Sequence, residues 1–154
     1  IISDDGPESR EEWETATNYR QSLSVMTWAE LREAAEAGIE VGAHTRSHRR
    51  LSSISANAEL LENEVAGCKR DIEAHTGKAC QTIAWPYGTA DDIDDKATTA
   101  IKAAGYKGAF SLIRAPIVPG QTSSYAIPRH HFEPQWPLRE VRFFALGGME
   151  KNSG

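Results

Sequence analysis

The sequence lacks any apolar run that approaches the roughly 20 residues a membrane-spanning helix needs. It also lacks an opening basic segment followed by a long apolar one, so no signal peptide is visible, although a trimmed secreted chain would look the same. Basic residues are fewer than acidic ones, and the formal net charge is -5. That deficit argues against a nucleic-acid partner, and the compartment stays open.

Cysteine is scarce, with Cys68 and Cys80 as its two occurrences. Two cysteines are too few for a disulfide framework or a zinc cluster. Cys68 falls on the apolar stripe of a predicted helix, which favours a buried thiol, and Cys80 opens a predicted strand. A disulfide between the two cysteines stays open, because a sequence does not show whether their Cα atoms lie within bonding range.

The composition is that of a globular protein, with 40% hydrophobic and 25% charged residues in a chain of 154. This length suits a single domain over residues 1–154, and we expect the tail at 149–154 to be frayed. Helical and strand patterns alternate with short connections. The alternation predicts βα units around a mainly parallel sheet, either open or barrel-like.

The individual elements follow from caps and periodicity. Thr27 and Glu30 form a capping box, and apolar residues repeat on one helical face from Leu61 to Ile72. Glycines at 38, 77 and 105 suit helix ends. The predicted helices cover about 11–19, 27–37, the stretch from after 55 to 77, 92–104 and 137–146, and the predicted strands cover 39–43, 79–85, 106–113 and 125–127.

Residues 44–48 (HTRSH) place two imidazoles four residues apart, directly after the predicted strand 39–43. Strand ends are where α/β folds keep their chemistry, and neutral imidazoles are good zinc ligands. His44 and His48 are therefore candidate metal ligands, although two histidines do not complete a site. The alternative is that one bonds backbone groups and the other is exposed. Arginines at 46, 49 and 50 surround the pair, and we expect them to lie in a solvated loop.

A second motif lies at residues 83–88 (IAWPYG). Pro86 withdraws one amide donor and Gly88 permits an unusual backbone angle, so the turn is rigid. Such a turn can direct the Tyr87 amide at a developing oxyanion. The alternative is an ordinary turn with its aromatic residues packed on the core.

These motifs, with the segments 26–31 (MTWAEL), 38–48 (GIEVGAHTRSH) and 103–106 (AAGY), closely resemble the polysaccharide deacetylase family, the NodB-homology or carbohydrate esterase 4 group, over about residues 25–131. The resemblance implies a deformed (β/α) barrel of fewer than eight repeats. It also implies a metal-dependent hydrolase that removes N- or O-acetyl groups from a polysaccharide. A location in the cell envelope or outside the cell is the tendency of that family.

The resemblance also implies roles for individual residues. His44, His48 and one aspartate would bind a divalent metal, usually zinc, with cobalt as a possible substitute. The metal would polarise the acetyl carbonyl and activate the attacking water. Tyr87 would donate its backbone amide to the oxyanion, and Thr45 would help to orient the histidine loop.

The aspartates are the first departure from the family pattern. The family opens with Thr-Phe-Asp-Asp-Gly, which supplies the base and the third ligand, and the nearest match here contains Asp4 and Asp5. Residues 8–25 are too short and polar for the helix and strand that the family inserts next. We therefore favour a loop position for this pair in a chain that lacks its first βα unit. The alternative, that Asp4 is the base and Asp5 the ligand, stays open.

Two later departures concern other catalytic groups. Ala84 and Trp85 replace an arginine that often precedes the turn, and Trp85 could stack on a sugar or pack in the core. The late Leu-His motif is not evident. In its place, Arg129 lies in a segment like the "LPR" of some members and could orient a catalytic group, with His130 or His131 as general acid.

A second function remains open at this point. The chain could be an inactive deacetylase-like fragment or a carbohydrate-binding domain, with Trp85, Tyr87 and Trp136 as an aromatic platform. The metal content of the purified chain discriminates between the two functions, because two imidazoles alone hold zinc weakly.

Overall fold

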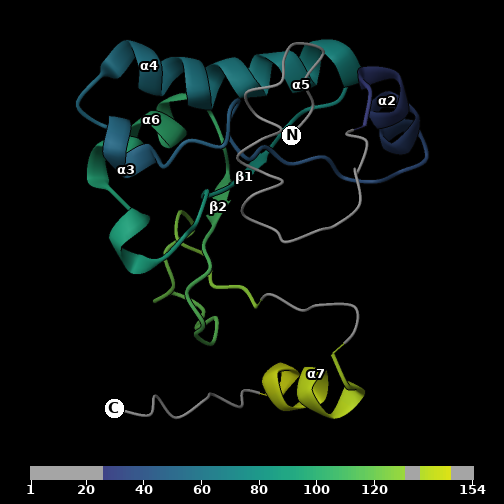
Figure 1. The fold of residues 1–154 in the computed structure, drawn as a ribbon, viewed down its shortest axis with the longest axis vertical. Coiled ribbons are helices and arrows are strands. Elements are labelled where there is room, and N and C mark those ends of the chain that lie inside the picture. The colour runs from purple at the N-terminus through teal and green to yellow at the C-terminus, as the bar shows by residue number, and fades with distance from the viewer. Residues whose placement is uncertain (1–25, 131–135, 147–154) are drawn as a thin grey trace, which may run out of the picture.

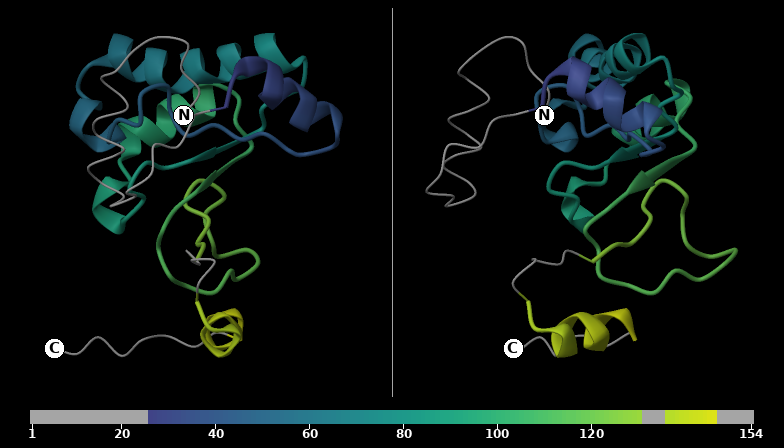
Figure 2. Two further views of the ribbon diagram at one scale, coloured as in Figure 1. Left: turned by 45° about the vertical axis from the view of Figure 1, so that its right-hand side comes forward. Right: turned by 90° about the vertical axis from the view of Figure 1, so that its right-hand side faces the viewer.

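The computed structural model describes residues 26–130 and 136–146. A long helical run crosses above the strands in Figure 1, and it comprises α4 (Ala58–Glu62), the π-helical turn η1 (Asn63–Gly67) and α5 (Cys68–Thr76). Figure 2 shows the same layer of helices from two further sides. The α/β class predicted from the alternating pattern is confirmed.

The sheet consists of β1 (Thr82–Ala84) and β2 (Gly108–Phe110), which pair in parallel. Both strands are shorter than the predicted 79–85 and 106–113. Within the described part of the chain, the sheet consists of these two strands, and they do not close into a barrel.

Single bridges extend the sheet on both sides. Ala43 pairs in parallel with Ile83, and Ile127 pairs in parallel with Phe110. Four neighbouring segments therefore run in the same direction, side by side and in chain order. The predicted first and last strands are present only as these bridges, so the expectation of full strands there is wrong. Ile39, at the start of the first predicted strand, is 62% exposed and gains little from extending the ladder.

The long helix after residue 55 forms as its periodicity predicts. The Asn57 side chain accepts a hydrogen bond from the Leu60 amide at the start, and left-handed Gly77 ends the run. Each apolar residue of the predicted face is at most 8% exposed: Leu61, Val65, Cys68 and Ile72. The sequence pattern did not predict the π turn in the middle.

Helix α2 (Trp28–Glu36) begins where its capping box predicts. The Glu30 amide donates to Thr27 Oγ1 at 3.3 Å, and the Glu30 carboxylate accepts from the Thr27 amide at 2.7 Å. Gly38 follows with φ of 94°, a conformation that glycine adopts without strain. The buried face of α2 packs against α5. A short helix, α3 (Leu51–Ile54), was not predicted.

Helix α6 (Asp95–Ala103) begins three residues later than predicted, because residues 90–92 form a separate 3-10 turn, η2 (Ala90–Asp92). Asp94 caps α6 by accepting from the Ala97 amide at 2.9 Å. The helix packs on the π turn and on α4. Its buried side chains complete the core between the helical layer and the sheet.

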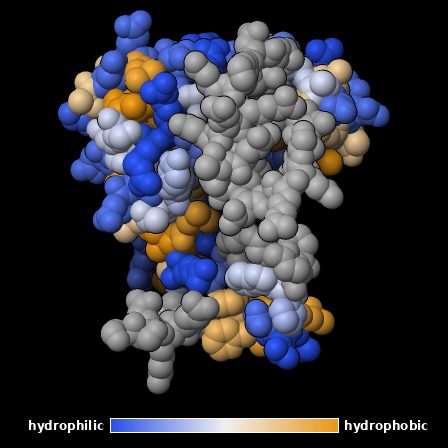
Figure 3. Space-filling view, in the orientation of Figure 1, coloured by the Kyte–Doolittle hydropathy of each residue, from blue (hydrophilic) through white to orange (hydrophobic). Residues whose placement is uncertain are grey.

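The last helix, α7 (Leu138–Ala145), lies at the end of the molecule opposite the helical layer (Figure 2). Pro137 occupies the N-cap position, one residue before the first turn in which it was expected. Exposed apolar side chains gather around α7 in Figure 3, among them Leu138 and Phe143. None of the helices in the described ranges is long and apolar enough to cross a membrane.

Both cysteines are buried free thiols. Cys68 lies on the helical run as expected, and burial raises the pKa of its thiol to about 11. Burial also raises the pKa of Cys80. The thiols are therefore part of the core and are poor nucleophiles at neutral pH.

Candidate active site

The candidate residues follow the carboxyl ends of three of the four parallel segments. His44 comes directly after the Ala43 bridge, and Tyr87 comes three residues after β1. Arg129 comes two residues after the Ile127 bridge. Parallel segments bring their carboxyl ends to one edge, so residues more than 80 positions apart in the sequence meet there.

The two imidazoles lie close together on the loop at 44–48. Their ring centroids are 4.8 Å apart, with an interplanar angle of 69°. His44 Nδ1 lies 2.9 Å from the carbonyl oxygen of Ala84. A carbonyl only accepts, so Nδ1 donates its proton and Nε2 keeps a free lone pair. In metal sites, a histidine typically donates one ring N–H to a carbonyl or carboxylate and binds the metal through its other nitrogen, and His44 has this orientation and tautomer.

Burial lowers the pKa of His44, and the nearby His48 and Arg129 lower it further, against the opposing hydrogen bond to Ala84. The ring is consequently neutral at neutral pH, which is the form that coordinates metal. The pair therefore fits two positions of a divalent metal site.

The Tyr87 turn meets the histidine loop directly. The ring centroids of His48 and Tyr87 are 5.2 Å apart. Tyr87 has φ of 63°, an unfavourable left-handed conformation for a tyrosine, and Gly88 follows with φ of 64°. Hydrogen bonds of 2.7 Å from the Gly88 amide to Pro86 and from the Leu112 amide to Gly88 hold the turn. A Cβ at Gly88 would lie 2.8 Å from the Leu112 nitrogen, so the turn requires glycine there.

Trp85 packs in the core. It is 1% exposed, and its indole N–H donates to the Tyr125 carbonyl at 2.9 Å. Of the two roles open from the sequence, stacking on a sugar is therefore wrong and core packing is confirmed. Tyr87, by contrast, is 46% exposed.

Arg129 and His44 line the same cavity of about 330 Å³ at the sheet edge. The Arg129 guanidinium donates through Nε to the Ser111 carbonyl at 3.1 Å, which fixes it beside the end of β2. The cavity also includes Ala84, where the family often has its arginine. Arg129 thus places a positive charge close to the position that Ala84 leaves uncharged.

The three arginines of the histidine loop are not simply solvated, which corrects the sequence expectation. Each forms an ion pair with an acid from a different helical element. The pairs are Arg46 with Asp71 on α5, Arg49 with Glu64 on η1, and Arg50 with Asp92 on η2. Residues 46–50 are therefore bound to three separate helical elements.

Arg50 links the loop to the tyrosine turn. Its guanidinium carbon lies 4.3 Å from the centre of the Tyr87 ring, within the range of a cation–π contact. Asp92, which is 1% exposed, also accepts hydrogen bonds from the amide and hydroxyl of Thr89. A buried carboxylate thus holds the arginine that lies over Tyr87.

Glu64 is the residue that the sequence interpretation missed. It is 2% exposed and accepts hydrogen bonds from the loop between the two histidines. A signal was present, because Glu64 stands three residues after Leu61 on the predicted apolar face. Thr45 is also buried, and its hydroxyl has no hydrogen-bond partner within the described ranges.

Other predicted site residues are less informative. Asp4, Asp5 and His131 lie outside the described residues. His130 is half-buried, with its ring centroid 4.9 Å from that of Phe144. Among residues 26–130 and 136–146, no three His, Cys, Asp or Glu side chains form a group that could hold a metal. A third ligand for the histidine pair is thus not found in that part of the chain.

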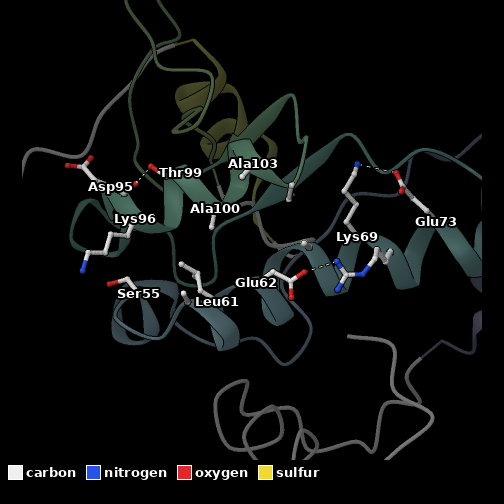
Figure 4. Close-up of a pocket in the computed structure, with 14 residues that line it drawn as sticks. Ser55, Leu61, Glu62, Lys69, Glu73, Asp95, Lys96, Thr99, Ala100 and Ala103 are labelled. Atoms are coloured by element: carbon white, nitrogen blue, oxygen red, sulfur yellow. Dashed lines mark hydrogen bonds and ion pairs between the residues drawn. The ribbon is translucent and has the colours of Figure 1, made fainter.

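A larger groove of about 860 Å³ lies between the α4–α5 run and α6. Figure 4 shows it lined by small apolar side chains such as Ala100 and Ala103, with charged groups around them, including the pair of Lys69 and Glu73. The histidine loop does not contribute to it. We therefore place the candidate chemistry at the sheet edge and not in the larger groove.

Comparison with solved structures gives eight matches, among them the following three deacetylases. A polysaccharide deacetylase from Bacillus cereus matches with a TM-score of 0.66 and 24% identity, over 80% of this chain and 38% of its own. The Streptococcus pyogenes deacetylase PplD, solved with acetate, matches with a TM-score of 0.63 and 18% identity, over 74% and 48%. A de-N-acetylase from Aggregatibacter actinomycetemcomitans matches with a TM-score of 0.59 and 18% identity, over 84% and 60%.

The chain therefore spans between about two fifths and three fifths of the length of these structures. At these identities the likeness establishes a shared fold. A comparison with curated proteins found no match. A sequence profile of the polysaccharide deacetylase family matches residues 4–109, more than half of the chain. The chain belongs to the polysaccharide deacetylase family.

Proposed function

We propose that this chain carries part of the active site of a metal-dependent hydrolase, which removes N- or O-acetyl groups from a polysaccharide. The single observation that supports this most is the His44–His48 pair beside the Tyr87 turn at one sheet edge. The sequential order of the parallel segments, with helices layered over them, suits an arc of a deformed (β/α) barrel.

In this proposal, the chain's own residues prepare the site. His44 presents Nε2 because Ala84 holds its Nδ1 proton, and His48 faces it from four residues along the loop. A divalent ion such as zinc would supply Lewis acidity to the acetyl carbonyl and make a bound water acidic. The Tyr87 amide would stabilise the oxyanion, and Arg129 would orient a reacting carboxyl or the substrate.

The third metal ligand, the general base and the general acid would come from residues outside the His44–His48 pair. Asp5 would be the ligand and Asp4 the base if the open assignment from the sequence holds, and both lie within the matched residues 4–109. His130 or His131 would be the acid.

Acetate release tests the proposal. The chain, incubated with zinc or cobalt and an acetylated glucosamine oligomer or an acetylated xylan oligomer, should release acetate, and a chelator should abolish the release. One tightly bound metal ion per chain should accompany the activity. Full activity without metal would refute the metal-dependent mechanism.

The non-catalytic alternative is weaker than it was from sequence, because Trp85 is buried and cannot join a sugar-binding platform. In the same experiment, this alternative predicts neither metal retention nor acetate release. A chain that binds the oligomer, retains no metal at micromolar concentration and releases no acetate would support that alternative.

A further inference from the structure

The buried carboxylate of Glu64 lies under the histidine loop. Its Oε2 accepts hydrogen bonds from the backbone amides of Arg46 at 3.0 Å and Ser47 at 2.9 Å. Its Oε1 accepts from the Ser47 hydroxyl at 2.6 Å. Both oxygens are therefore engaged by the two residues that follow Thr45 and precede His48.

The loop needs such support because its backbone is strained. Thr45 has φ of 62° and His48 has φ of 59°, and neither is a glycine. Left-handed residues of this kind persist where the surroundings over-determine them. Successive amides beside a left-handed residue form a concave anion site, and here the anion is a side chain of the same protein.

The helix beneath is adapted to the loop. Glu64 lies in the π turn, a wide helical turn that is often found at functional sites. Gly67 on the same turn leaves room for Arg46, because a Cβ there would lie 3.3 Å from Arg46 Nη1 and 3.2 Å from Asn63 Oδ1. Asn63 also accepts a hydrogen bond from Arg46. Two residues of the turn therefore bind the loop, and a third makes space for it.

We propose that Glu64 is a positioning residue, which holds His44 and His48 in the arrangement that binds a divalent ion. Its oxygens are occupied by the loop, so it acts through the histidines and is not a ligand itself. The metal part of this inference rests on the proposed function, whereas the ordering of the loop does not.

Three variants separate this role from a general contribution to stability. Glu64→Ala removes all three acceptor bonds, and Glu64→Gln keeps one oxygen for the backbone amides. Glu73→Ala is the matched control: Glu73 lies on α5, accepts from the Cys80 amide at 3.0 Å and pairs with Lys69 at 3.0 Å (Figure 4). It thus loses similar bonds outside the histidine loop.

The first readout is amide hydrogen exchange of the metal-free chain, followed residue by residue. Exchange at Arg46 and Ser47 should be at least about tenfold faster in Glu64→Ala than in the wild type, and intermediate in Glu64→Gln. The second readout is cobalt affinity from the visible spectrum. It should fall by about 10- to 100-fold in Glu64→Ala, the range for loss of a group that orients metal ligands, and recover partly in Glu64→Gln. Glu73→Ala should match the wild type in both.

The outcomes are distinguishable. Wild-type exchange and wild-type cobalt affinity in Glu64→Ala would overturn the inference, and so would an equal loss of affinity in Glu73→Ala. A wild-type chain that binds no cobalt, with loop exchange still increased in Glu64→Ala, would refute the metal function and leave the positioning role supported. If Glu64→Ala does not fold, Glu64→Gln decides by the same two readouts.

Discussion

At the scale of the residue, the site depends on backbone groups as much as on side chains. The Ala84 carbonyl selects the tautomer of His44, and the amide of Tyr87 is the proposed oxyanion donor. The left-handed conformation of Tyr87 is what sets the direction of that amide. A substitution at Tyr87 that keeps the ring and the backbone should therefore keep the proposed oxyanion donor.

Tyr87→Phe should lower acetate release by less than about tenfold, because phenylalanine keeps the backbone amide and the ring under Arg50. Removal of an oxyanion donor costs about 100- to 1,000-fold. Steady-state kinetics on an acetylated oligomer measure the difference. A hundredfold loss would mean that the Tyr87 hydroxyl carries the role assigned to the amide.

The thiols give a second prediction at this scale. A pKa of about 11 leaves Cys68 almost entirely protonated at pH 8, and burial raises the pKa of Cys80 as well. Both should react with a disulfide reagent at least about 100-fold more slowly in the native chain than in urea, where two thiols should titrate. The stability contributed by the protonated Cys68 thiol is complete below its unfolded pKa of about 8.5 and should decrease as pH rises toward 11. Fast native labelling would place a thiol on the surface.

At the scale of the element, the histidine loop is joined to three helical elements through its arginines. Two of the acids, Glu64 and Asp92, are almost fully buried. A buried acid that loses its partner is costly, whereas an exposed pair contributes little. The three ion pairs should therefore contribute different amounts to the free energy of unfolding.

Asp92→Ala should destabilise the chain by about 2 kcal/mol, less than the full cost of breaking a buried pair because Arg50 is 44% exposed. Glu62→Ala is the matched control, since the Glu62–Arg70 pair is 56% and 63% exposed and should cost less than about 1 kcal/mol. Urea unfolding measures both. Equal effects would show that burial of Asp92 does not set its contribution.

At the scale of the whole molecule, the four parallel segments gather His44, Tyr87 and Arg129 at one edge. A metal ion that binds the folded chain better than the unfolded one stabilises the folded state, because the unfolded chain does not keep the geometry of the site. Metal binding should therefore be visible as global stability.

Zinc at about 100 times its Kd should add about 2.7 kcal/mol and raise the Tm by roughly 5–10 °C. His44→Ala and His48→Ala should lose this increase. His75→Ala is the control, because His75 stacks on Trp28 with centroids 4.1 Å apart, on the helical layer. Differential scanning calorimetry with and without chelator measures the shift. An unchanged zinc effect in His44→Ala would exclude that residue as a ligand.

Local signals were sufficient for much of the fold. The capping box of Thr27, the apolar face around Val65 and the glycine at 77 each depend on neighbours within a few residues, and all were predicted. Strand lengths were not, because a ladder extends only as far as a partner segment lies beside it. The first and last predicted strands are single bridges for that reason.

The sequence by itself determined the family, the order of helices and parallel segments, and the two histidines with the tyrosine turn, since these depend on short motifs and local periodicity. The packed fold alone shows that Trp85 is core, that Arg50 pairs with the buried Asp92, and that Glu64 lies under the loop. Those contacts join residues 17 to 42 positions apart, and the position of each partner depends on the packed fold.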